Sequence, residues 1–146
     1  MSGAAYFISK WAERALVKPL LLLLDEKGLL PLSEVLEVQV SSPLEAVSWD
    51  IAVIYSGGVF RVDVKVAARA RVQLSPRTSR DIKLSLGQKI PVLVYVPSKV
   101  HLIFPSDLPR LPQVIGLDFL NLLPTYPVDP KTSRLVEYAY EAMLAT

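Results

Sequence analysis

Two aspartates and one lysine lie at a spacing that suits a divalent cation. In the stretch WDIAVIYSGGVFRVDVK, residues 49–65, Asp50 precedes an apolar run, and Asp63 and Lys65 alternate with valines in a second run. An aspartate in the middle of a strand is disfavoured unless something binds it. Carboxylate oxygens are the ligands that hard divalent cations prefer. We therefore interpret the two aspartates as ligands of one cation, with the ammonium of Lys65 beside it. The alternative is a cross-strand salt bridge between Asp50 and Lys65.

This interpretation depends on a hairpin that turns at Ser56-Gly57-Gly58. A symmetric loop closing on Tyr55 and Phe60 places Asp50 opposite Lys65 and Ala52 opposite Asp63. Directly opposed side chains have Cβ atoms about 5 Å apart and diagonal ones about 7 to 8 Å apart, so both carboxylates can reach the same ion. A bulge or an odd-numbered loop would change the register.

Basic residues continue the polar face of the second strand, and such a strip suits phosphate groups. The pattern extends this face from Arg61 to Gln73, whereas the opposite face, which includes Val62 and Val64, is apolar and predicts core. A short helix after Pro76 adds further basic side chains. The predicted nucleic-acid contacts are Lys10, Arg61, Arg69, Arg71, Arg77 and Arg80. The alternative for the strand arginines is a solvated strand face.

The elements that position these residues follow the order α, β, β, β, α, β, β, α. AYFISKWAERALV has apolar residues at helical spacing, Pro19 kinks or restarts that helix, and Gly28 ends the element that follows. SEVLEVQV alternates as a strand, and the acidic SSPLEAVS is a loop. RTSRDIKLSLGQ predicts a helix, PVLVYV and SKVHLIFP predict strands, SDLPRLPQVIG is loop-rich, and TSRLVEYAYEAML predicts an amphipathic helix.

Composition limits the classes of protein that the chain can form. A length of 146 residues favours one domain over residues 1–146. The hydrophobic fraction of 51% suggests a homodimer interface in addition to a core. The absence of cysteine removes disulfides and thiolate metal sites, and the single histidine, His101, predicts a structural residue. The longest apolar run is too short to span a bilayer, and no signal peptide is evident, so we expect an intracellular, cytoplasmic protein. Twelve prolines with no cysteine lean toward a heat-adapted source.

An Asp, a second acid about a dozen residues later and then x-Lys, on adjacent strands, resembles the active-site pattern of the PD-(D/E)xK nucleases. The resemblance implies an α/β, restriction-endonuclease-like fold, a mixed β-sheet flanked by helices. It also implies metal-dependent phosphodiester hydrolysis, in which Mg²⁺ or Mn²⁺ acidifies a water molecule. Asp50 and Asp63 would then bind the metal, and Lys65 would position the attacking water.

SKWAERALV, residues 9–17, is similar to the first-helix segment of archaeal Holliday junction resolvases. The helix glutamate of that family matches Glu13, which the resemblance makes a third metal ligand, bound directly or through water. LIFPSDLPRL also resembles the hydrophobic strand of these resolvases that runs into a short F-x-x-L segment. The resemblance implies that the protein acts on branched DNA and is associated with the nucleoid. A homodimer would suit such a substrate, because two symmetry-related strands must be cut.

Two other classes of protein stay open. The acidic loop, the net charge of only +2 and the apolar VAARARV after Lys65 all favour a catalytically degenerate nuclease fold. Such a protein would bind nucleic acid without cutting it, or serve as a structural subunit. The third class is a scaffold that binds protein through its apolar surface, with the hairpin charges forming only a salt bridge.

Overall fold

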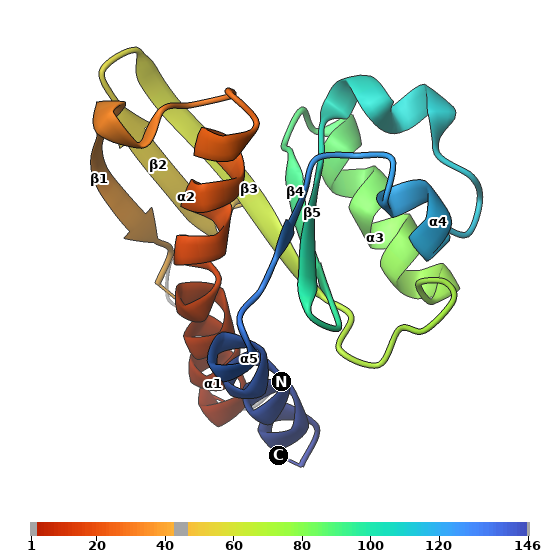
Figure 1. Cartoon of the computed structure of the whole chain (residues 1–146). Helices are drawn as coiled ribbons and strands as arrows, with labels where there is room; N and C mark the ends of the chain where they lie inside the picture. Colours follow the sequence, from red (N-terminus) through yellow and green to blue (C-terminus); the bar gives the residue numbers. More distant parts are fainter. Residues whose placement is uncertain (1–2, 43–46, 146) are drawn as a thin grey trace.

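The computed structural model describes residues 3–42 and 47–145, and the side chains of residues 3–7 lie outside the description. Within it, one mixed sheet contains six strands whose spatial order follows the chain order. Only the β3–β4 pair is parallel, and every other neighbouring pair is antiparallel. The strands are β1 (Val35–Val40), β2 (Ile51–Tyr55), β3 (Gly58–Val66), β4 (Val92–Val96), β5 (Lys99–Ile103) and β6 (Thr125–Pro127). The sheet curls, so β1 and β2 are turned away from β4 and β5 (Figure 1).

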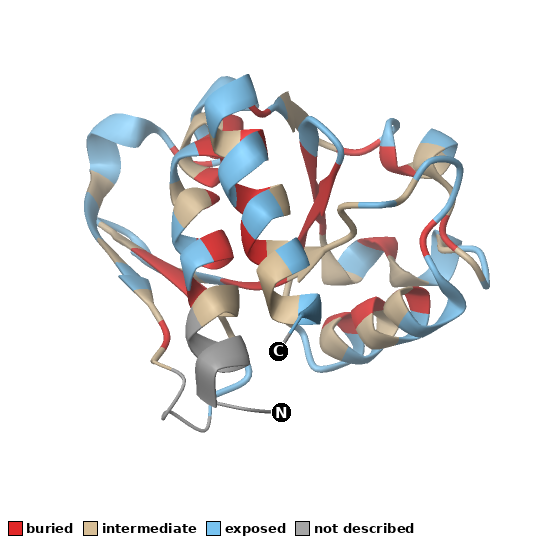
Figure 2. Cartoon of the chain, turned by 90° about the horizontal axis from the view of Figure 1, so that it is seen from below, coloured by how far each residue is buried: buried red, intermediate tan, exposed pale blue. Residues whose placement is uncertain are grey.

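Helices flank the curled sheet (Figure 1). The buried apolar side chains form two cores. The first core joins α1 (Gly3–Ala15), α2 (Val17–Glu26) and α5 (Pro130–Leu144) to β2 and β3. The second joins α3 (Pro76–Gly87) and α4 (Leu117–Leu120) to β4. Buried residues lie on the helix surfaces turned toward the sheet, and exposed residues lie on the outer surfaces (Figure 2). The predicted α/β class with a helix-flanked mixed sheet is confirmed at this level.

The first predicted helix is divided by Pro19, as expected. α1 ends at Ala15 and α2 begins at Val17, which makes Pro19 the third residue of α2. A proline at this point needs no intrahelical N–H bond, and its ring would clash with the carbonyl four residues earlier if the first helix continued. Gly28, with φ of 68°, follows the end of α2 in the left-handed conformation. The break allows α1 to pack along α5 while α2 turns toward β6.

The hairpin has a tighter turn than predicted. Tyr55 pairs with Gly58 across a two-residue loop, so Ala52 stands opposite Arg61 rather than Asp63. The predicted register is therefore wrong by two residues. Gly58 has φ of 150°, a backbone conformation that other residues rarely adopt, and this lets the second strand begin directly after the turn.

The predicted pairing of Asp50 with Lys65 is wrong for the same reason. Asp50 lies just before β2, and its backbone N–H donates to the carbonyl of Val62 at 2.8 Å. Because side chains alternate along a strand, a shift of two residues leaves Asp63 and Lys65 on the face that the sequence predicted.

The basic strip does not continue as a strand. β3 ends at Val66, and the chain then turns, with the N–H of Ala70 donating to the carbonyl of Ala67 at 3.1 Å. Arg69 and Arg71 are exposed on this turn and not on the polar face of β3. The prediction of one continuous strip from Arg61 to Gln73 is wrong, because the alternation in the sequence continues beyond the last strand hydrogen bonds.

The remaining connections contain short elements that the sequence pattern did not predict. They are η1 (Leu32–Glu34), η2 (Pro105–Arg110), α4 and β6. The other predicted helices and strands are present, and α5 begins at Pro130 with Asp129 as its cap. The predicted acidic loop before Asp50 lies partly outside the described residues, at 43–46. In the described ranges, no helix combines the length and apolar character needed to cross a bilayer.

Candidate active site

Lys10 and Glu13 form one side of the site. They are three residues apart on α1 and therefore lie on the same face of the helix. Both are buried, at 9% and 8% exposure. The ammonium of Lys10 lies 2.6 Å from Oε1 of Glu13, 2.9 Å from Oγ of Ser41 and 3.2 Å from Oδ1 of Asp50. Its three donors thus join α1 to the residues at the two ends of the β1–β2 connection.

Asp50 is held by backbone on both sides. Its carbonyl accepts from the N–H of Ser41 at 2.9 Å, just after β1. Its Oδ2 accepts from the N–H of Val64 on β3 at 2.8 Å. The carboxylate therefore points at the middle of β3, and only Oδ1 is turned toward Lys10.

Asp63 and Lys65 form the third side of the site. Asp63 is buried at 8% exposure, and its Oδ2 accepts from Oγ of Ser85 on α3 at 2.8 Å. The ammonium of Lys65 is 3.2 Å from the same oxygen. The side chain of Lys65 is 31% exposed, so its ammonium can reach solvent while it neutralises Asp63. One helix, α1, and the hairpin thus supply the charged groups of one site, and α3 adds the hydroxyl of Ser85.

The carboxylates influence each other electrostatically. Burial raises the pKa of Glu13 to about 7, the charge of Asp50 adds to this rise, and Lys10 opposes it. Burial also raises the pKa of Asp63 to about 6, and the nearby Asp50 carboxylate adds to this rise against the opposing charge of Lys65. For Lys10, burial alone would lower the pKa, but the bonds and charges of Glu13 and Asp50 outweigh it, so the pKa is raised. One buried lysine therefore does not offset both the burial of Glu13 and the repulsion of its acidic neighbours.

The donor chemistry of this cluster suits a hard divalent cation. Three carboxylates converge, and burial together with their mutual repulsion raises the pKa of Glu13 and Asp63. As the side chains lie, no group of three His, Cys, Asp or Glu residues among those described is arranged to hold a metal ion. The ammonium of Lys10 lies between Glu13 and Asp50. A cation that used both of these carboxylates would have to displace it.

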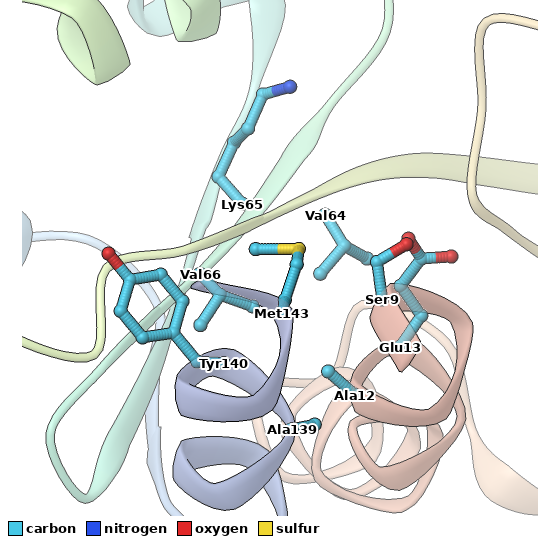
Figure 3. A pocket seen from close by; sticks show the side chains of 9 residues that line it. All are labelled: Ser9, Ala12, Glu13, Val64, Lys65, Val66, Ala139, Tyr140 and Met143. Atoms are coloured by element: carbon cyan, nitrogen blue, oxygen red, sulfur yellow. The ribbon is translucent and has the colours of Figure 1, made fainter. Parts of the chain in front are cut away.

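An apolar pocket adjoins the site between α1, β3 and α5, with a volume of about 160 Å³. Ser9 and Glu13 line it from α1, and Tyr140 and Met143 line it from α5 (Figure 3). Lys65 borders the pocket, but its ammonium points away from α1 and α5 (Figure 3). Glu13 therefore separates the apolar pocket from the charged cluster.

The predicted nucleic-acid contacts lie in different environments. Lys10 is part of the buried cluster instead of a basic surface. Arg61, Arg71, Arg77 and Arg80 are exposed. Arg69 is exposed as well, but it makes a bidentate ion pair with Glu141 of α5 at 2.7 Å and stacks over Tyr140 at 5.8 Å. Only Arg61 shares the polar face of β3 with Asp63 and Lys65.

Sequence reasoning missed Ser41, Ser85 and the position of Lys10. The spacing of Lys10 and Glu13 on one helix was a visible signal that the two side chains could pair. Nothing in the sequence indicated that Ser41 and Ser85 would reach the acids, since both contacts cross between elements. His101 is 1% exposed, and its Nδ1 lies 2.7 Å from Oγ1 of Thr125, as expected for a structural residue.

Comparison with known proteins gives no relative for this chain: no family model, curated protein or solved structure matches it.

Proposed function

We propose that this protein is a metal-dependent, structure-specific DNA endonuclease with a restriction-endonuclease-like fold. The observation that carries the proposal is the convergence of Glu13, Asp50, Asp63 and Lys65, from one helix and one hairpin, in one partly buried cluster. Burial, reinforced by the neighbouring carboxylates, raises the pKa of Glu13 and Asp63, and a bound cation would stabilise both groups in their charged form. The resemblance to the PD-(D/E)xK nucleases rests on Asp50, Asp63 and Lys65, and the resemblance to the junction resolvases adds Glu13.

Each residue would have a distinct role. Asp50 and Asp63 would bind Mg²⁺ or Mn²⁺, and Glu13 would complete the coordination directly or through water. The bound metal would lower the pKa of a water molecule and offset the charge that develops on the phosphate oxygens. Lys65, whose ammonium lies beside Asp63 and can reach solvent, would hold that water in position. Ser85 and the Val64 N–H keep the two aspartates oriented.

The preferred substrate in this proposal is a four-way DNA junction. The resemblance of residues 9–17 to archaeal junction resolvases supports it, as does the apolar composition, which suits a homodimer. A two-fold dimer would present two sites to the two symmetry-related strands that must be cut. Exposed arginines would contact phosphates, and Arg61, two residues before Asp63 on β3, is the one closest to the site in sequence.

The test is cleavage of an end-labelled four-way junction with Mg²⁺ or Mn²⁺, with a duplex of the same sequence as the reference substrate. We expect cleavage of the junction and a loss of about 100-fold or more in Lys65→Ala. Lys131→Ala is the matched control, because Lys131 is an exposed lysine on α5. Cleavage that survives both Asp50→Asn and Lys65→Ala rules out the assignment.

The second candidate is a degenerate nuclease fold that binds nucleic acid without cutting it. The observation that favours it is the ammonium of Lys10, which already forms ion pairs with Glu13 and Asp50. A thermal shift on addition of Mn²⁺ separates the two candidates. A shift that disappears in Asp63→Ala supports the nuclease, and binding of DNA without any response to metal supports the degenerate protein.

A further inference from the structure

Lys10 is a lysine held in place at three points. Its ammonium carries three hydrogens, and three oxygens surround it: Oε1 of Glu13, Oγ of Ser41 and Oδ1 of Asp50. The residue is 9% exposed, although the next basic residues on α1 and α2, Arg14 and Lys18, are exposed. Burial of a lysine is unfavourable unless its charge is paired, so these contacts hold it at the centre of the acids.

The oxygens that Lys10 occupies are those that a metal would need. Oδ2 of Asp50 already accepts the Val64 N–H, which leaves Oδ1 as the oxygen turned toward the cluster. Oδ2 of Asp63 likewise holds Ser85 and Lys65. A divalent cation that bridged Glu13 and Asp50 would share Oδ1 with the ammonium and would lie within a few ångströms of its positive charge. Repulsion between the two cations makes simultaneous occupancy unfavourable.

We propose that the ammonium of Lys10 and a divalent cation are alternative occupants of the position between Glu13 and Asp50. This inference rests on the metal site of the proposed function. Without metal, Lys10 compensates the acids and keeps α1 attached to the β1–β2 connection through Ser41. With metal, Lys10 leaves, and the affinity for metal is lower than three carboxylates alone would give. Lys10 thus competes with the metal for the carboxylates and lowers the affinity of the site for metal.

The chemistry of lysine permits such an exchange. Its charge sits on a flexible chain of four methylenes, so the ammonium can move several ångströms without movement of the helix. The predicted contact of Lys10 with nucleic acid would require the ammonium to leave Glu13 and Asp50, because both ion pairs hold it in this structure.

The experiment measures Mn²⁺ binding to the full chain by calorimetry, without DNA, so its result does not depend on cleavage. Lys10→Met removes the ammonium and keeps much of the volume, and Lys10→Gln keeps a hydrogen-bond donor for Glu13 if the first variant folds poorly. Arg14→Met is the matched control, because it removes one positive charge from an exposed position on the same helix. We expect Mn²⁺ to bind Lys10→Met and Lys10→Gln about tenfold tighter or more, with no such gain in Arg14→Met.

Thermal unfolding gives a second readout. Without metal, both Lys10 variants should unfold at a lower temperature than the native chain, because Glu13 and Asp50 lose their counter-charge. Mn²⁺ should then raise their unfolding temperature by more than it raises that of the native chain. A variant that folds only when Mn²⁺ is present gives the same support.

Unchanged or weaker Mn²⁺ binding in both Lys10 variants overturns the exchange. If the native chain still cleaves a junction in that case, the proposed function stands and only the role of Lys10 is lost. If neither the native chain nor the variants bind Mn²⁺, the exchange is overturned together with the metal site. An equal gain in Arg14→Met also overturns it, because the effect would then come from net charge alone.

Discussion

Asp63 and Asp107 are buried to the same extent, at 8% exposure each, yet they have different surroundings. Asp107 serves its own turn: its Oδ2 accepts the N–H of Phe104 at 2.9 Å, and Oδ1 pairs with Arg110 of the same short helix. Asp63 has partners from distant elements, Ser85 on α3 and the Asp50 carboxylate, in addition to Lys65. The contacts of Asp107 neutralise its charge, whereas Asp50 adds negative charge next to Asp63.

The comparison shows that two equally buried acids can differ in how far their surroundings compensate their charge. A structural carboxylate is surrounded by donors that stabilise its charge, and such a group adds to the stability of the fold. A carboxylate kept near another carboxylate reduces stability, so its position needs another explanation. In this protein the explanation that we propose is a bound cation.

The largest effect is expected for Asp63→Asn. Loss of a metal ligand should reduce junction cleavage by about 1,000-fold, because an amide oxygen binds a hard cation more weakly than a carboxylate. The measurement is the single-turnover rate at saturating protein. Asp107→Asn is the matched control, with the same substitution at a site of equal exposure, and its folded protein should cleave at the native rate.

The same two variants should move stability in opposite directions. The pKa of Asp63 is raised to about 6, so at pH 7.5 its charge destabilises the fold, and Asp63→Asn should raise the free energy of unfolding by about 1–3 kcal/mol. Asp107→Asn should lower it by about 1–2 kcal/mol, since it loses the pairing with Arg110. Denaturant unfolding measures both, and a loss of stability in both variants would remove the distinction between the sites.

Much of this contrast was not visible in the sequence. Alternation and apolar runs predicted β4 and α5, and the residue types predicted that Asp50, Asp63 and Lys65 belong together. The register was missed because the length of a glycine-rich turn decides it, and Gly58 allowed the shorter loop. β6 was missed because three residues, one of them proline, give no readable alternation.

The cluster around Lys10 could not be predicted in full for a different reason. The sequence contained the Lys10–Glu13 spacing, but burial of the pair depends on α1 packing against the β1–β2 connection. Side-chain contacts between elements distant in the chain are not encoded in any local pattern. A lysine in a basic stretch was therefore interpreted as a surface contact for phosphate.

The second prediction concerns the pH dependence of stability through Glu13. Its pKa is raised from 4.5 to about 7, so the folded protein holds this proton more tightly than the unfolded chain does. Its contribution to stability is fully present below about pH 4.5 and is lost as pH rises through 7. Relative to Glu13→Gln, the native chain should therefore lose about 3 kcal/mol over this range.

Unfolding of the two proteins by urea at a series of pH values measures this difference. Addition of Mg²⁺ should reduce the loss at pH 7, because a bound cation compensates the ionised carboxylate. Parallel pH profiles for the native chain and Glu13→Gln would contradict the idea that Glu13 is buried among uncompensated acids.

The third prediction uses His101, a buried group that serves structure as Asp107 does. Burial lowers its pKa from 6.5 to about 4, and the charge of Lys99 adds to the effect. Its contribution to stability is therefore present above about pH 6.5 and is lost as pH falls toward 4, the opposite sign to Glu13. Between about pH 6.5 and 5 this loss should reach about 2 kcal/mol and should be absent in His101→Gln.

Junction cleavage by the folded variant at pH 7.5 should equal that of the native chain, and a large loss of activity would place His101 in the site.

The smallest effects are expected on the surface, where Arg61 and Arg69 extend the comparison to the basic side chains. Arg69 already holds Glu141 in a bidentate ion pair, so a contact with phosphate must first break that pair. Arg61 is exposed on the same strand face as Asp63. Arg61→Ala should weaken binding to a junction by about fivefold at moderate salt and reduce the salt slope by about one, whereas Arg69→Ala should weaken it about twofold or less.

Glu141→Gln should strengthen binding slightly, because it releases Arg69. Equal losses in the two arginine variants would mean that the ion pair between Arg69 and Glu141 opens at no cost to DNA binding.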